Sequence, residues 1–147
     1  MVRKAEITDL LPLAELFEGY RSFYNKPKDQ LGVEEFLSER INNGDSEIFV
    51  LESEGLLCGF VQLYPLFSST RMKKYWLLND LFVDEKSRGK GFSKLLIESA
   101  QELCKYSGAC GILLETGKNN DIGNRLYPAC GFELYDEVNF YEWTNKE

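Results

Sequence analysis

The sequence predicts one mixed α/β domain over residues 1–147, with a central mixed sheet of six to seven strands and about four helices on both faces. Three observations lead to this prediction. The chain has the length of a single domain. Strand-like and helix-like hydrophobic periods alternate along it. One helical pattern lies between two strand patterns, which predicts parallel neighbouring strands joined by a right-handed crossover.

The first third of the chain predicts one strand and two helices. They are a strand over 2–7, a helix from residue 8 or 9 to residue 23, and a helix over 32–43. Thr8 or Asp9 can cap the first helix, and Gly44 can end the second. The helices are separated by a break that contains Pro27. Three aromatic residues beside this break either fill core or line a substrate pocket: Tyr20, Phe23 and Tyr24.

The remainder predicts further strands and two more helices. They are strands over 46–52, 56–67, 74–83 and 109–115, helices over 90–106 and 120–129, and a final strand region over 132–143. The first two of these strands form a predicted antiparallel hairpin, in which Gly59 is a candidate bulge.

Composition excludes several kinds of function. The formal net charge of −7 argues against a general nucleic-acid surface and mildly favours cationic substrates such as amines. The absence of histidine excludes histidine-based triads and zinc sites, and we expect no metal. The cysteines are widely spaced and no secretory leader is recognised, so we expect reduced thiols in a cytoplasmic protein. No apolar run reaches the ~18 residues of a membrane span.

A strand, a glycine-containing turn and a helix follow one another over residues 78–96. Gly89 and Gly91 precede the helix, whose first backbone N–H groups have no intrahelical partner and attract anions. Arg88, Lys90 and Lys94 add positive charge, so a pyrophosphate would fit here. The alternative is a tight strand-to-helix connection with solvated basic residues. The pattern is neither a Walker A loop nor the dinucleotide fingerprint.

Two motifs resemble the GNAT superfamily of N-acetyltransferases. Residues 88–93, Arg-Gly-Lys-Gly-Phe-Ser, resemble its Arg/Gln-x-x-Gly-x-Gly/Ala pyrophosphate loop, with Ser93 in the last position. Residues 120–132 resemble its Asn-x-x-Ala-x-x-Leu-Tyr-x-x-x-Gly-Phe motif, with Gly123 replacing Ala at some cost in helix propensity. Residues 62–69 and 78–83 are similar to the small acetyltransferases related to the yeast histone and polyamine acetyltransferase group. That similarity implies homodimers built with C-terminal strands.

The resemblance implies acetyl-CoA as co-substrate. Backbone groups of Phe82 and Val83 would contact the pantetheine arm, and a backbone N–H near Leu81 or Phe82 would meet the thioester oxyanion. The implied cofactor-binding residues are Leu81, Phe82, Val83, Arg88, Gly89, Lys90, Gly91, Phe92, Ser93, Asn120 and Tyr127.

The resemblance also implies catalytic roles. Tyr127 would protonate the departing thiolate, or else be a buried helix aromatic. Glu115 would be the general base, or only orient the substrate ammonium or water; a water chain could also take the proton. Asn79 stands where histone-acetylating members carry a catalytic Glu, and Asp80 should point to the opposite face of the strand. Tyr24, Asn79 and Asp80 are expected to line the substrate pocket.

The expected function is therefore an acetyl-CoA-dependent N-acetyltransferase that acts by direct attack of an amine in a ternary complex. The acceptor would be a small amine, a polyamine or a basic peptide, with no nucleic-acid or membrane partner. The alternative is a non-catalytic acyl-CoA-binding sensor or regulatory module, and a domain that binds any phosphate is a third reading.

Overall fold

The computed structural model describes residues 1–146 and divides the chain into two compact units. The first unit is Met1–Glu115 and the second begins at Thr116. The first unit contains the sheet and most of the helices. The second contains α4 (Asp121–Ala129), followed by an irregular segment.

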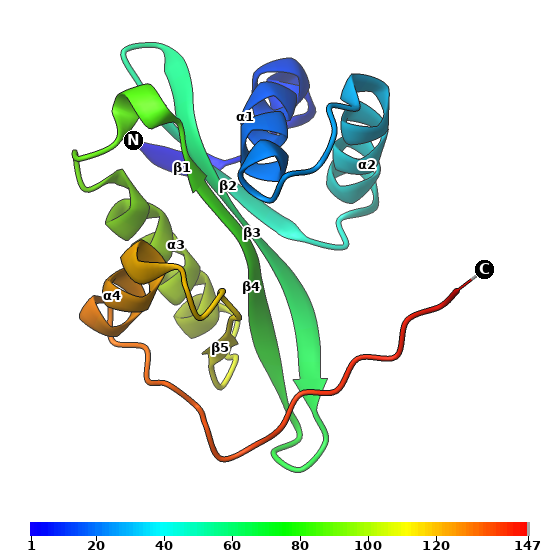
Figure 1. Ribbon diagram of the computed structural model, residues 1–147, viewed down its shortest axis with the longest axis vertical. Helices are drawn as coiled ribbons and strands as arrows, with labels where there is room; N and C mark the ends of the chain where they lie inside the picture. The colour runs from blue at the N-terminus through cyan, green and yellow to red at the C-terminus, as the bar shows by residue number, and fades with distance from the viewer. Residues whose placement is uncertain (147) are drawn as a thin grey trace. The chain divides into compact units, whose positions relative to one another are not determined.

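The first unit is built on one five-stranded sheet in the order β1-β2-β3-β4-β5 (Figure 1). Its strands are β1 (Val2–Lys4), β2 (Glu47–Ser53), β3 (Leu56–Ser68), β4 (Lys73–Val83) and β5 (Ile112–Leu113). Its helices are η1 (Ile7–Asp9), α1 (Leu10–Phe23), α2 (Gln30–Asn43), η2 (Glu85–Ser87) and α3 (Phe92–Tyr106). Neighbouring strands are antiparallel, except that β4 and β5 are parallel. The parallel pairing predicted for the strands on either side of α3 is thus confirmed.

The predicted strand count is wrong. The sheet has five strands rather than six to seven, and the region over 132–143 forms no strand among the described residues. A strand needs a neighbour to pair with its backbone. In this segment Phe140, Tyr141 and Trp143 are exposed instead of packed on a sheet. Alternating apolar residues therefore indicated β propensity without showing that a pairing edge exists.

Two hydrophobic cores cover opposite faces of the sheet. This agrees with the expectation of helices on both faces. Alternation along β2 divides its side chains, with Ile48 and Val50 in one core and Leu51 in the other. The first core includes residues of α1 and α2, and the second includes residues of α3. In Figure 1 these helices lie on opposite sides of the sheet. Each fully buried large aliphatic side chain contributes about 1.5–3 kcal/mol.

A β-bulge in β4 positions the polar residues that matter below. Gln62 pairs with Asp80, whereas Leu63 pairs with Leu78, so Asn79 is an extra residue on β4. Without the bulge, Leu78 and Asp80 would share a face. With it, Leu78 packs in the α3 core, while Asp80 lies on the face where α1 packs, beside Tyr20.

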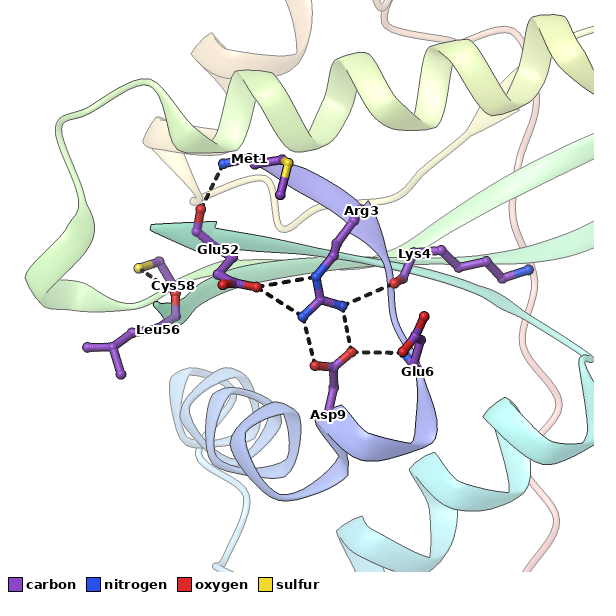
Figure 2. A network of polar contacts seen from close by, with 8 residues as sticks. All are labelled: Met1, Arg3, Lys4, Glu6, Asp9, Glu52, Leu56 and Cys58. Atoms are coloured by element: carbon purple, nitrogen blue, oxygen red, sulfur yellow. Dashed lines mark hydrogen bonds and ion pairs between the residues drawn. The ribbon is translucent and has the colours of Figure 1, made fainter. Parts of the chain in front are cut away.

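An ion-pair network ties β1 to η1 and β2 (Figure 2). The Arg3 guanidinium donates to both carboxylate oxygens of Asp9, at 2.8 and 2.9 Å, and to Glu52 at 3.1 Å. Asp9 also accepts the backbone N–H of Glu6. The predicted cap is corrected here, because Asp9 stands at the N-cap position of α1 but its side chain makes no cap hydrogen bond there. Arg3 already holds that carboxylate.

Candidate active site

The start of α3 presents backbone N–H groups without a side-chain cap. Gly91 is the N-cap residue, it makes no side-chain cap bond, and α3 begins at Phe92 rather than at the predicted residue 90. The first backbone donors of a helix have no intrahelical partner. Gly89, Lys90 and Gly91 are exposed at this helix start. The uncapped turn therefore has the donor geometry of an anion site.

Gly89 and Gly91 are required here by backbone conformation. Their φ angles are +79° and +77°, a left-handed region that other residues adopt at a cost of roughly 1–2 kcal/mol. A Cβ atom at either position would meet nothing within 4 Å. The space beside both glycines is open, so a ligand can approach the backbone.

Arg88 is anchored to the end of β4. Its Nε donates to the Val83 carbonyl at 3.0 Å, and its guanidinium lies 5.6 Å from the centre of the Phe82 ring. Lys90 lies similarly over the Phe92 ring, at 5.9 Å. These contacts fix the two basic side chains beside the helix start.

One edge of β4 is open next to this turn. β5 pairs with β4 only through Trp76 and Leu77. Within residues 1–146, no strand pairs with that side of β4 from Leu78 to Val83. The Asp84 N–H bonds to Cys58 on β3, and backbone groups of an antiparallel strand alternate between its two sides. By this alternation Leu81 and Val83 face the open edge.

A buried polar network lies on the α1 face of the sheet. Ser46 Oγ donates to Gln62 Oε1 at 2.9 Å, and Gln62 Nε2 donates to Asp80 Oδ2 at 2.7 Å. Asn79 Nδ2 donates to the other Asp80 oxygen at 3.0 Å. The expectation that Asn79 and Asp80 point to opposite faces is therefore wrong, because the bulge brings the two side chains together. Asp80 is only 4% exposed, whereas Asn79 is exposed.

The network contains strongly perturbed ionisable groups. Burial raises the pKa of Asp80, although hydrogen bonds from Gln62, Tyr20 and Asn79 act in the opposite direction. Burial, followed by the negative charge of Asp80, also raises the pKa of Tyr20 well above its usual range. The same two causes raise the pKa of Tyr64 to about 12. The tyrosines therefore remain neutral beside the carboxylate at ordinary pH.

The aromatic residues of α1 divide between the two roles left open for them. Tyr20 packs against the first core, and its hydroxyl donates to the Asn79 carbonyl at 3.2 Å. Tyr24 is 48% exposed and meets the Tyr20 ring edge-on, with the ring centres 5.1 Å apart. Phe23 is 58% exposed. Tyr20 thus contacts both the core and the polar network, while the half-exposed Tyr24 contacts Tyr20 and solvent.

Two residues singled out from sequence lie in the second unit. Asn120 caps α4, accepting the Gly123 N–H and donating to Thr116 Oγ1. A Cβ atom on Gly123 would stand 2.7 Å from Asn120 Nδ2, which explains why glycine suits this position. Tyr127 lies within α4, with its ring edge-on to Phe132 at 5.9 Å.

Glu115 closes the first unit and is exposed, two residues beyond β5. Asn79, Asp80, the open edge of β4 and the start of α3 thus all lie in the first unit. Among residues 1–146, no cluster of three or more Cys, Asp or Glu side chains could hold a metal ion. No helix in that range is long and apolar enough to cross a bilayer.

Sequence reasoning assigned no role to Gln62 or Ser46. Gln62 is fully buried between apolar neighbours on β3 and is the direct partner of Asp80. A signal did exist, because an amide within the run Phe60-Val61-Gln62-Leu63 interrupts a core strand, and buried polar groups need partners.

Comparisons with known proteins agree on one family. The sequence model of the Acetyltransferase (GNAT) family matches residues 13–132. An uncharacterized N-acetyltransferase of Bacillus subtilis, YhfO, is 39% identical over 132 residues, covering 90% of this chain and 89% of the relative. The spermine/spermidine N(1)-acetyltransferase of the same organism is 31% identical over 90 residues, 59% of each chain. A crystal structure of a probable acetyltransferase superposes with a TM-score of 0.95 at 29% identity, covering 100% of this chain and 99% of the other.

Proposed function

The chain belongs to the GNAT family of acetyltransferases, and from this premise we propose that it transfers the acetyl group of acetyl-CoA to a primary amine. The amine nitrogen attacks the thioester carbon in a ternary complex, a C–N bond forms and the C–S bond breaks. The observation that carries the proposal is the uncapped start of α3, with its two left-handed glycines, beside the open edge of β4.

That geometry supports the following acetyl-CoA contacts. Backbone N–H groups over residues 88–93 bind the pyrophosphate. The pantetheine arm lies along β4 at Phe82 and Val83. Of the two residues expected to supply the oxyanion donor, Leu81 is favoured, because strand alternation turns its N–H to the open edge and that of Phe82 toward β3.

The proton roles rest on the family motifs. We propose that Tyr127 protonates the leaving thiolate and that Asn120, beyond its capping role, contacts the cofactor. Glu115 or a water chain receives the proton of the acceptor amine. Tyr24, Asn79 and Asp80 line the acceptor site.

The acceptor class is supported by charge. The chain has a net charge of −7, and Asp80 is a buried carboxylate that a cationic substrate would compensate. One relative is named for spermine and spermidine. We therefore propose a small amine or polyamine as acceptor, and a basic peptide as the second choice.

We also propose the domain organisation, the assembly and the location of the protein. We propose that the two units belong to one acetyltransferase domain, which the family match over residues 13–132 supports. The exposed aromatic residues after residue 133 support a homodimer in which this segment pairs with a second copy. Free thiols at Cys58, Cys104, Cys110 and Cys130 suit a cytoplasmic location.

Role variants test the proposal. Tyr127→Phe should lower turnover about 10²–10⁴-fold while leaving calorimetric acetyl-CoA affinity within a few fold, because the hydroxyl acts only on the leaving group. Glu115→Gln should shift the pH profile if Glu115 is the base. Unchanged turnover in Tyr127→Phe would show that Tyr127 is not the general acid. Tight cofactor binding without acetylation of any amine would favour the sensor alternative, which the amide at Asn79 in place of a carboxylate supports.

A further inference from the structure

Asp80 is a carboxylate held inside the first unit by neutral groups. It is 4% exposed, its hydrogen-bond donors are the amides of Gln62 and Asn79, and the Tyr20 hydroxyl lies beside it. A buried charge without a cationic partner is unfavourable, and such groups favour their neutral form. A carboxylate in these surroundings therefore readily accepts a proton that is brought to it.

A chain of hydroxyl groups leads from Asp80 toward solvent. The Tyr20 hydroxyl lies beside the Asp80 carboxylate, and the Tyr20 ring meets the Tyr24 ring edge-on at 5.1 Å. It also lies 3.2 Å from the Asn79 carbonyl. A phenolic hydroxyl rotates to suit its partners and can donate and accept at once. Tyr24 is 48% exposed, so the chain runs from a half-exposed residue to a buried acid.

We propose that Tyr20 and Asp80 form a proton relay that deprotonates the acceptor ammonium. The inference rests on the proposed acetyl transfer and specifies its proton acceptor. As the ammonium N–H bond breaks, its electron pair stays on nitrogen and the proton passes to the Tyr20 oxygen. The Tyr20 hydroxyl proton moves simultaneously to an Asp80 oxygen. The products are a neutral amine, a neutral Tyr20 and a protonated Asp80.

The relay is placed beside the reacting atoms. Asp80 directly precedes Leu81, whose N–H faces the open edge where the thioester would lie. Nucleophile activation and oxyanion stabilisation would then come from consecutive residues of β4. After transfer, the proton leaves Asp80 through Tyr20 and Tyr24 to water.

The surrounding charges leave Asp80 as the acceptor. The groups that act on Asp80 are the neutral side chains of Gln62, Tyr20 and Asn79, and Asp80 in turn acts on the neutral Tyr64 of β3. Arg40, near the end of α2, acts on Tyr64 but is held by Asp45 at 2.7 Å and by Glu39 at 3.5 Å.

Kinetics against pH give the main test. We expect Tyr20→Phe and Asp80→Asn each to lower kcat about 10²-fold or more, and to make kcat/KM follow the fraction of amine already deprotonated in solution. Calorimetric acetyl-CoA affinity should not change. Tyr106→Phe, at an exposed tyrosine on α3 outside the site, should match wild type throughout. Wild-type rates and pH profiles in Tyr20→Phe or Asp80→Asn would overturn the relay.

A second readout does not need activity. Carbon NMR of the Asp80 carboxyl should show titration above the usual aspartate range, moving further upward in Tyr20→Phe, because the Tyr20 hydroxyl bond lowers the pKa. Titration of Asp80 in the usual range, or no response to Tyr20→Phe, would reject the relay. A wild-type protein that shows the raised pKa but acetylates no amine would instead reject the proposed function.

Discussion

Glycine at position 91 is explained by backbone conformation and ligand access rather than by packing in the core. Its φ of +77° is needed at the start of α3, yet nothing lies within 4 Å of the position a Cβ would take. Gly108, just after α3, has the same properties, with a φ of +69° and open space. Comparing substitutions at Gly91 and Gly108 therefore distinguishes the effect of backbone strain from an effect on ligand binding.

We predict that Gly91→Ala and Gly108→Ala each lower the free energy of unfolding by about 1–2 kcal/mol, because both force a side chain into the left-handed region. Only Gly91→Ala should also weaken acetyl-CoA binding, by about tenfold, because the added Cβ would occupy open space through which the ligand approaches the backbone, and a loss of about 1.4 kcal/mol corresponds to that factor. Chemical denaturation and calorimetry measure the two effects. Equal acetyl-CoA affinities in the two variants would argue against ligand contact at residue 91.

Some residues of the candidate site can be singled out from sequence and others cannot, for a physical reason. The glycines and basic residues of the loop over 88–93 were recognised because they form a contiguous pattern. Asp80 was expected in the pocket, but its partners Gln62 and Ser46 come from other strands. Strand registers that bring such residues together are set by pairing and bulges, which a single sequence does not display.

At the scale of elements, α1 approaches the sheet closely through Gly19. A Cβ atom there would stand 2.8 Å from Cζ of Phe82 on β4. The absent side chain thus lets the helix that carries Tyr20 pack against the strand that carries Asp80. Helix propensity alone would favour alanine at this site.

Gly19→Ala should lower the free energy of unfolding by about 1–3 kcal/mol, because overpacking against Phe82 outweighs the gain in helix propensity. Ser22→Ala is the control on the same helix; Ser22 is exposed, so the substitution should be neutral or slightly stabilising. Thermal and denaturant unfolding measure both variants. A Gly19→Ala protein as stable as Ser22→Ala would show that the helix can shift away without loss.

The elements themselves were largely predictable. Their order and type up to residue 129 follow hydrophobic period and turn residues, and α2 and α3 differ from prediction by about two residues at one end. The segment after residue 132 was not predictable, because β propensity cannot supply the neighbouring strand. The bulge at Asn79 was hidden for the same reason, since it exists only relative to β3.

On the scale of the whole molecule, the Arg3 network closes the N-terminal edge of the sheet. Asp9 is 8% exposed and bonded to Arg3 through both oxygens, which lowers the pKa of Asp9 below its ordinary value. A carboxylate whose pKa is lower in the folded chain stabilises folding above its unfolded pKa. That contribution disappears as pH falls through the folded pKa.

Asp9→Asn should therefore destabilise the protein at neutral pH by about 1–3 kcal/mol, the range for hydrogen bonds to charged groups. The difference from wild type should shrink as pH falls below the ordinary aspartate pKa of about 4. Glu47→Gln, which removes the ion pair between the half-buried Glu47 and the exposed Lys4, should cost no more than about 1 kcal/mol. A constant Asp9→Asn difference at all pH values would show that packing rather than charge explains the effect.

The central claim, that this acetyltransferase acetylates a primary amine, is tested most directly by free-thiol release from acetyl-CoA with and without spermidine, with the acetylated product identified by mass spectrometry. We predict release that depends on the amine, with one acetylated amine formed for each thiol. Thiol release that is the same with and without any amine in a panel of polyamines, small amines and basic peptides, with no acetylated product, would contradict the account.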